Sequence, residues 1–366
     1  MRRKFLLKTL ITTLLLLVTF STSAFQDKKH EEADSEKGTK QEIKEFINHH
    51  LKDSHDFGIT SYTAEDGEKK HVGFSLPVIL WDEGFHIFSS SKFHHETNVV
   101  ESKGNYYKVY HGLIVKTDSK GTITYDEKHH ATNVKPLDLS ITKGVMMIII
   151  TALLMLWLFI SLAKSYGKNN GIAKGAGRFF EPIILYIRDD IAIPNIGEKN
   201  HGKYMSFLLT IFFFIWFLNI FGLTPLGVNV TGNIAITFSL ALLTFLITTF
   251  TAKKDYWKHI FWMPGVPIPM KIVLAPIELL GVIIKPFSLL IRLYANMQAG
   301  HIVLMSLIGL IFIFKTWLGG GLSFFLAFAI SLIEVLVALL QAYIFTMLSA
   351  LYFGFASEEH DHEEAH

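Results

Sequence analysis

The hydrophobic residues of this chain are concentrated in its second part, in runs long enough to cross a lipid bilayer. Residues 145–163 form an uncharged run of about the 20 residues that a spanning helix needs. Residues 204–252 carry no charge and have turn-forming residues only at 224–233, which predicts two spans. Two longer apolar stretches, 272–314 and 322–355, follow on either side of a glycine run. The pattern predicts about five membrane helices, the last two forming a long C-terminal helical hairpin.

These last two stretches are too long to cross a bilayer at right angles. At about 1.5 Å per helical residue, the first measures about 65 Å, roughly twice the hydrocarbon thickness of about 30 Å. We therefore expect these helices either to tilt strongly or to break near Pro276 and Pro286.

The chain begins with a segment that has the three parts of a secretory signal peptide. Residues 2–8 contain four basic side chains, residues 10–20 are apolar, and residues 21–24 are small. The apolar run is too short to span a bilayer comfortably, and an uncleaved anchor is the alternative. In either case we expect the following segment to be carried across a membrane.

Residues 25–140 have the pattern of a small α+β region exposed to water. Apolar residues at helical spacing predict a helix at 42–51, and β-rich runs at 71–81, 106–116 and 121–125 predict strands. The region holds 11 of the 17 histidines. Imidazole suits zinc, copper and nickel, but no pair of histidines has clear third and fourth ligands. We therefore expect solvated surface histidines, with metal binding as the alternative.

Basic residues set the expected orientation of the membrane helices. Residues 164–203 carry seven Lys and Arg and residues 253–271 carry four, whereas the turns around Gly227 and Gly319 carry none and one. Because loops rich in Lys and Arg stay in the cytoplasm, we place residues 25–140 outside. The predicted divisions are a signal peptide (1–24), an extracytoplasmic His-rich region (25–140), a membrane domain (141–357) and an acidic, His-containing cytoplasmic tail (358–366). The predicted fold class is an all-α polytopic membrane protein with a small α+β extracytoplasmic N-terminal region.

Composition and charge exclude several classes of chemistry. Half of the 366 residues are hydrophobic, and the mean hydropathy of +0.36 is too high for an ordinary soluble chain. A net charge of +2 gives no electrostatic case for binding nucleic acid. The absence of cysteine excludes disulfides, thiol nucleophiles and cysteine-ligated metals. The remaining chemistry belongs to histidines, carboxylates and arginines.

The two apolar stretches of the predicted C-terminal hairpin contain five acidic, basic or imidazole side chains, namely Glu278, Lys285, Arg292, His301 and Glu334. A charge at the centre of a bilayer costs from about 2.5 to more than 10 kcal/mol, so such residues mark an ion pathway by default. Glu278, Lys285 and Arg292 recur every seven residues and share one stripe, with Asn296 about 40° away. His301 lies about 180° round the helix from Arg292.

Hairpin geometry predicts which residues of the two helices face each other. A turn centred between Trp317 and Leu318 sets His301 opposite Glu334 and places Gln341 within about one turn of Arg292. An imidazole facing a carboxylate can handle protons near neutral pH. The alternative is a buried ion pair that fixes the register of the hairpin.

Arg292 cannot be a link in a chain of proton transfers, because its guanidinium does not release a proton at accessible pH. It acts as a fixed positive charge. The residues three and four positions away are Ser288, Leu289, Ala295 and Asn296, none of them acidic. Full compensation of this charge therefore calls for a carboxylate from another chain.

These residues resemble a known family. Residues 285–300 (KPFSLLIRLYANMQAG) and 340–345 (LQAYIF) are similar to the signatures of subunit a of F-type ATP synthases. Residues 219–225 (NIFGLTP), followed by Thr231 and Asn233, resemble a further signature. The resemblance covers about residues 140–356 in order.

The resemblance implies a stator beside a rotating ring of c subunits, with two aqueous half-channels for protons. Arg292, with Asn296 and Gln341, would face the ring and force an arriving carboxylate to ionise. His301 and Glu334 would belong to the inlet half-channel, and Glu278 to the outlet half-channel. The family commonly has an acid where His301 stands and, in well-studied bacterial members, a histidine where Glu334 stands. The pair is exchanged here.

The implied partners are the c-ring proteolipid, the b-subunit peripheral stalk, the rest of the complex and the bilayer of a bacterial inner membrane. No cofactor, metal or catalytic reaction of its own is implied. A proton-coupled secondary transporter is the alternative, but it would have an inverted repeat, and the two predicted hairpins differ in length and charge. A simple membrane anchor would not need five ionisable groups in lipid. The coupling ion, proton or sodium, stays open because its selective site lies mostly on the ring.

Overall fold

The computed structural model describes most of the chain. The described residues are 47, 53–63, 69–94, 98–127, 131–168, 175, 177–224, 228–263, 266–313 and 316–358. The predicted signal peptide, nearly all of the helix predicted at 42–51 and the tail beyond residue 358 lie outside them. The described residues divide into two compact units, one around residues 305–327 and one comprising residues 53–304 and 328–358.

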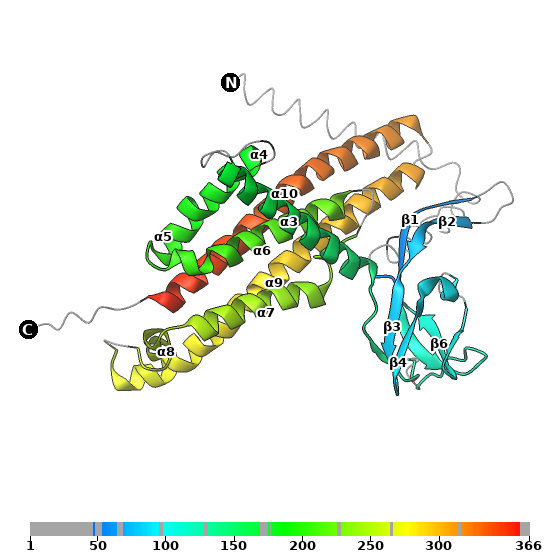
Figure 1. The fold of residues 1–366 in the computed structure, drawn as a ribbon, viewed down its shortest axis with the longest axis horizontal. Coiled ribbons are helices and arrows are strands. Elements are labelled where there is room, and N and C mark those ends of the chain that lie inside the picture. The colour runs from blue at the N-terminus through cyan, green and yellow to red at the C-terminus, as the bar shows by residue number, and fades with distance from the viewer. Residues whose placement is uncertain are drawn as a thin grey trace, which may run out of the picture. The chain divides into compact units, whose positions relative to one another are not determined.

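Long apolar helices make up the second part of the chain (Figure 1). Within the described residues, five helices are long and apolar enough to cross a membrane. They are α3 (Lys143–Lys168), α6 (His201–Leu223), α7 (Ile234–Thr251), α9 (Ile268–Ile313) and α10 (Trp317–Ser357). Helices satisfy all their backbone hydrogen bonds internally, as a lipid environment requires. The predicted all-α polytopic membrane fold with about five spans is confirmed.

The helix α9 is continuous over 46 residues, with Pro276 and Pro286 inside it. The sequence had left tilt and breakage as alternatives, and the described helix does not break. The three glycines at 319–321 lie inside α10, which begins at Trp317. The interruption between the two helices therefore falls before the glycine run.

Short helices, which the sequence pattern did not predict, occupy both basic loops. They are α4 (Gly177–Tyr186), the π-helical segment η2 (Ile187–Ala192), α5 (Ile193–Ile196) and α8 (Lys254–Phe261). Ile187 and Ile191 of η2 are buried and belong to the main hydrophobic core. That core is centred on α6 and also contains Leu293 of α9 and Phe345 of α10. It holds the two longest helices against α6.

The N-terminal region is built from short antiparallel strands. Its strands are β1 (Asp56–Thr63), β2 (Lys69–Ser75), β3 (Pro77–Trp81), β4 (Phe85–Ser89), β5 (Val100–Ser102), β6 (Asn105–Tyr110), β7 (Leu113–Thr117) and β8 (Leu137–Asp138). They form three small sheets of order β1-β2, β4-β3-β8 and β5-β6-β7. Alternate residues such as Val78, Leu80 and Tyr107 are fully buried between them, as expected for half-buried strands.

The strand predicted at 121–125 is wrong. Only an isolated bridge between Tyr125 and Ala131 occurs there. Two side chains take the backbone donors that a strand would need, because the amide of Thr122 donates to Asp118 and that of Thr124 donates to Asn133, both at 2.8 Å. Side-chain acceptors of this kind compete with sheet pairing.

The β region contacts the membrane helices through a small apolar cluster. Phe57 and Leu76 lie in one buried cluster with Met147 of α3, Leu218 of α6 and Val228. Each of these five side chains is at most 5% exposed. The contact brings the start of β1 to the beginning of α3.

Candidate functional site

Three of the predicted site residues come together where α9 meets α10. Asn296 donates a hydrogen bond of 3.0 Å from Nδ2 to Oε1 of Gln341, which is only 2% exposed. Arg292 lies one helical turn before Asn296 and is half-buried. Within the described part of the chain, Arg292 forms no salt bridge. The arrangement offers a cation in a membrane helix without a counterion from the described residues.

Glu334 lies in a buried position next to a glycine of α9. It is 9% exposed, and its two oxygens accept no hydrogen bond from a described residue. A Cβ placed on Gly300 would lie 2.7 Å from Oε1 of Glu334. The register predicted from the sequence put His301 opposite Glu334, and Gly300, the residue before His301, lies next to the Glu334 carboxylate. The missing side chain of Gly300 leaves the space that the carboxylate fills.

His301 is 3% exposed and lies against α6. A Cβ placed on Gly222 would lie 3.3 Å from Nε2 of this imidazole. His301 and Glu334 thus come from adjacent positions of the helix pair without a direct hydrogen bond between them.

The connection between α6 and α7 is fixed by asparagines. Oγ1 of Thr231 donates to Oδ1 of Asn219 at 2.7 Å, and both residues are fully buried. Asn233 caps α7 by accepting the amide of Ala235 at 3.0 Å. These are residues of the sequence motif at 219–233, so the motif has a structural explanation.

A polar line on α9 leads from this connection to His301. Nδ2 of Asn229 donates a long hydrogen bond of 3.5 Å to Oε1 of Gln298. Tyr294, Gln298 and His301 are spaced four and three residues apart, so they lie on one face of the helix. Tyr294 and Asn229 also line a cavity of about 230 Å³. Its size is enough for several water molecules.

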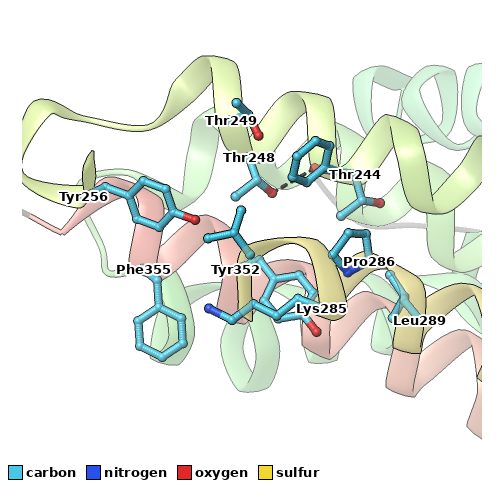
Figure 2. Close-up of a pocket in the computed structure, with 11 residues that line it drawn as sticks. Thr244, Thr248, Thr249, Tyr256, Lys285, Pro286, Leu289, Tyr352 and Phe355 are labelled. Atoms are coloured by element: carbon cyan, nitrogen blue, oxygen red, sulfur yellow. Dashed lines mark hydrogen bonds between the residues drawn. The ribbon is translucent and has the colours of Figure 1, made fainter. Parts of the chain in front are cut away.

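A second cavity lies on the other side of Arg292 along α9 (Figure 2). Figure 2 shows Tyr256 of α8, Lys285 of α9 and Tyr352 of α10 around it. The cavity measures about 20 Å³, enough for about one water. The ammonium of Lys285 lies 5.9 Å from the ring centre of Tyr352 and 5.4 Å from that of Phe355. These aromatic faces stabilise the cation.

Glu278 lies two turns before Lys285 on α9 and is half-buried. Burial raises the pKa of the Tyr256 hydroxyl, and the negative charge of Glu278 raises it further. Glu278 is therefore electrostatically coupled to a residue that lines the second cavity.

The chemistry of the site is that of charges and protons. Among the described residues, no group of three His, Asp or Glu side chains could hold a metal ion. The structure offers ionisable groups, buried on one side and half-buried on the other, on either side of an arginine that cannot release a proton.

The family model described as ATP synthase A chain matches residues 145–354, which include all six predicted site residues. The chain belongs to the ATP synthase A chain family. The resemblance found in the sequence motifs is confirmed. As a member of this family, the chain is a multi-pass membrane protein with a proton-translocating role in the membrane sector of ATP synthase, assembled with the rest of that complex.

Relatives from several bacteria support the assignment. ATP synthase subunit a of Chloroherpeton thalassium is 44% identical over 235 residues, covering 63% of this chain and 70% of the relative. ATP synthase subunit a of Myxococcus xanthus is 43% identical over 244 residues, covering 63% of this chain and 79% of the relative. ATP synthase subunit a 2 of Chlorobaculum tepidum is 42% identical over 241 residues, covering 64% and 68%.

The N-terminal region matches a different family. Residues 46–139 match a family described as Domain of unknown function (DUF8433). This match contains the strands β1 to β8. The chain therefore joins an ATP synthase A chain membrane domain to a region for which the comparison gives no role.

Sequence reasoning missed several polar residues around the site. Asn229, Gln298 and Tyr294 lie on the side of His301, whereas Tyr256 and Tyr352 lie on the side of Glu278. The spacing of Tyr294, Gln298 and His301 on one helix face was a usable signal. No local signal connects Asn229 or Tyr256 to α9, because those contacts depend on the packing of separate helices.

Proposed function

We propose that this chain is the stator subunit that carries protons past a rotating ring of c subunits, through two aqueous half-channels that meet near Arg292. The observation that carries the proposal is the placement of Arg292. Its cation lies on a membrane helix, half-buried, with no carboxylate of the described chain within salt-bridge distance. A partner that brings a carboxylate into the membrane would compensate it.

The electrostatics of Arg292 account for its role as a gate. A nearby cation favours the ionised form of a carboxylate and lowers the pKa of that group. A ring carboxylate that reaches Arg292 therefore gives up its proton. Because the guanidinium keeps its own protons, it also blocks a direct proton leak between the half-channels. Asn296 and Gln341, joined by a hydrogen bond, present polar groups beside this position.

The inlet half-channel is assigned to the side of His301 and Glu334, and the outlet half-channel to the side of Glu278. Along the axis of α9, His301 lies about 14 Å from Arg292 in one direction and Glu278 about 21 Å in the other, at about 1.5 Å per residue. The cavity beside Tyr294 supports the inlet, and the cavity beside Lys285 supports the outlet. The two ionisable groups of the inlet are exchanged relative to the family pattern. His301 stands where the family commonly has an acid, and Glu334 stands where well-studied bacterial members have a histidine.

The distribution of basic residues supports an orientation in a bacterial inner membrane. The loops of residues 164–203 and 253–271 are rich in Lys and Arg and lie in the cytoplasm, so the N-terminal region is periplasmic and the C-terminus cytoplasmic. The tilted helical hairpin of α9 and α10 then faces the c-ring. The b-subunit peripheral stalk holds the stator in place.

The test compares Arg292→Ala and Arg292→Lys in the assembled ATP synthase. We expect both variants to assemble and the alanine variant to lose ATP-driven acidification of inverted membrane vesicles. The lysine variant keeps the charge but loses the planar geometry, so we expect it to pump poorly. Arg188→Ala is the matched control, because Arg188 is exposed and already paired with Asp189. Normal proton pumping by the Arg292→Ala variant would contradict the proposed role of Arg292 as an electrostatic gate.

A further inference from the structure

Six apolar side chains form two rows on one face of the sheet β4-β3-β8, whose strands β3 and β4 lie side by side in Figure 1. The pairing of Trp81 with Phe85 and with Leu137 makes one row. Ile79 pairs with Ile87 and accepts the amide of Leu139 at 2.9 Å, which makes the other row. Paired residues, and residues two apart along a strand, point to the same side of a sheet. We call these six residues the apolar sheet face.

This face is exposed, although the opposite face of the same strands is covered. Five of its six side chains are 49–67% exposed, and the sixth, Ile79, is half-buried. The residues between them point the other way, and Val78, Leu80 and Phe88 lie in the hydrophobic core of the region. Strands that are apolar on both faces are typical of sheets covered on both sides. We therefore expect a partner or a lipid surface to cover the apolar sheet face.

The sheet leads directly into a membrane helix. Its hydrogen bonding extends beyond β8 to Ile141, whose amide donates to the carbonyl of Pro77 at 3.2 Å, and only Thr142 separates Ile141 from α3. The hydroxyl of Thr142 and the amide of Gly144 donate to the carboxylate of Asp53, at 2.8 Å and 3.0 Å. These bonds tie the start of β1 to the same junction. The sheet is therefore attached to the end of a spanning helix by hydrogen bonds and not by a long linker.

The exposed apolar surface of α3 begins four residues after Ile141. Val145, Ile149 and Leu153 are exposed and recur every four residues, so they lie on one side of the helix. Successive rows of the sheet are about 7 Å apart, which places the apolar sheet face within about 14 Å of Ile141. The interfacial layer of a bilayer is about 5–8 Å deep on each side. A sheet that lies along the membrane surface places the whole face against this layer.

Size and composition favour lipid over a second protein as the cover. Three strands about 4.8 Å apart and two rows about 7 Å apart make a patch of roughly 200 Å². A stable protein interface covers about 800 Å² on each partner. A surface already held at the membrane by α3 needs no such area to stay in contact with lipid. The face carries no charge, and the rings of Trp81 and Phe85, 4.6 Å apart, are of the kind that favours membrane interfaces.

We propose that the apolar sheet face is a membrane-docking surface that rests in the headgroup layer of the bilayer beside the start of α3. The region that matches a domain of unknown function thereby has a lipid surface as its binding partner. The proposal requires only that α3 spans the membrane, so it does not depend on the proton pathway.

The test uses single cysteines, because the wild-type chain has none. Ile87→Cys and Leu137→Cys place a thiol-reactive fluorophore on the face, and both side chains are exposed, so the core stays intact. Leu113→Cys is the matched control, since Leu113 is 53% exposed but belongs to β7 in another sheet. The assembled ATP synthase is reconstituted in phosphatidylcholine liposomes that contain a lipid with a nitroxide on its headgroup. Wild-type complex treated with the fluorophore gives the background.

We expect the lipid nitroxide to quench the fluorophore at positions 87 and 137 at least about twofold more than at position 113, because the interfacial layer holds the nitroxide. Iodide dissolved in the water should quench in the opposite order. Equal quenching by iodide at the three positions would show that the face is free and would overturn the proposal. Weak quenching by both agents at positions 87 and 137 would show that a protein covers the face, which would also overturn it.

A charge on the face gives a second measurement. Ile87→Glu in the Leu137→Cys background puts a carboxylate against lipid, where burial of a charge is unfavourable. We expect quenching by the nitroxide at position 137 to fall and quenching by iodide to rise. Leu113→Glu makes the same change away from the face and should alter neither. Unchanged quenching in the Ile87→Glu variant would contradict docking through this face.

Discussion

Gly300 of α9 and Glu334 of α10 lie so close that a methyl group on the glycine would come within 2.7 Å of Oε1 of the carboxylate. The obstructing atom is the end of a flexible side chain, so an alanine at this position would displace the carboxylate without separating the helices. The space beside Gly300 therefore determines where the carboxylate lies.

The first prediction concerns this space. We expect Gly300→Ala to reduce passive proton flux severalfold while the complex still assembles. Gly222→Ala should have a smaller effect, because its Cβ would meet the His301 ring at 3.3 Å, a contact that small shifts can relieve. Gly281→Ala is the control on the same helix, since a Cβ there meets nothing within 4 Å. Equal proton flux in all three variants would show that the space beside Gly300 does not affect proton passage.

The second prediction concerns the carboxylate itself. Glu334→Gln keeps the size of the side chain but removes its ability to carry a proton, so we expect proton flux to fall by about 10²-fold. Flux is measured through the membrane sector after removal of the ATPase part. Glu358→Gln makes the same change at an exposed position at the end of α10 and should leave the flux unchanged. An unchanged flux in Glu334→Gln would count against the inlet assignment.

The third prediction concerns the hydrogen bond between Asn219 and Thr231. Both residues are fully buried, so removing one partner leaves the other unsatisfied and should cost about 1–3 kcal/mol of stability. The double variant Asn219→Ala/Thr231→Val should cost less than the sum of the two single variants. Thermal unfolding of the complex in detergent measures all three. Strict additivity would mean that the bond contributes nothing.

The fourth prediction concerns the pH dependence of the N-terminal region. The ammonium of Lys116, 2.9 Å away, holds the pKa of the Asp82 carboxyl below its usual value, and the Tyr107 hydroxyl also donates to it. A lowered pKa in the folded state stabilises the region above the usual value of about 3.9, and this contribution is lost as the pH falls further.

Hydrogen exchange of β6 and β7 in the full chain measures this effect. We expect protection to fall below about pH 4 in the wild type, and this acid response to be much weaker in Asp82→Asn. Glu101→Gln is the control on the neighbouring strand β5. The same acid response in Asp82→Asn and the wild type would exclude Asp82 as its source.

The membrane helices could be predicted from the sequence, because lipid demands long apolar segments with internal hydrogen bonds. The strands could be predicted only in part. The runs at 71–81 and 106–116 contain strands, but β1, β4, β5 and β8 were missed. At 121–125 the side chains of Asp118 and Asn133 replace sheet pairing. Short strands depend on their neighbours more than on their own pattern.

The proximity of Glu334 to the part of α9 around His301 could be predicted, because two helices joined by a short turn have little freedom to slide. The contacts of Asn229 with Gln298 and of Asp53 with Gly144 could not. Their partners are 69 and 91 residues apart in the chain. Periodicity within one helix carries no information about such pairs.

The unbroken course of α9 has a consequence for its neighbours. A helix of 46 residues is about 69 Å long, and crossing about 30 Å of hydrocarbon leaves about 60 Å of travel in the plane of the membrane. Upright helices pack about 8–10 Å apart, so α9 passes about six or seven of them. Under the proposed function, a ring built from such helices would therefore contact α9 with several of its helices at once, including the one beside Arg292.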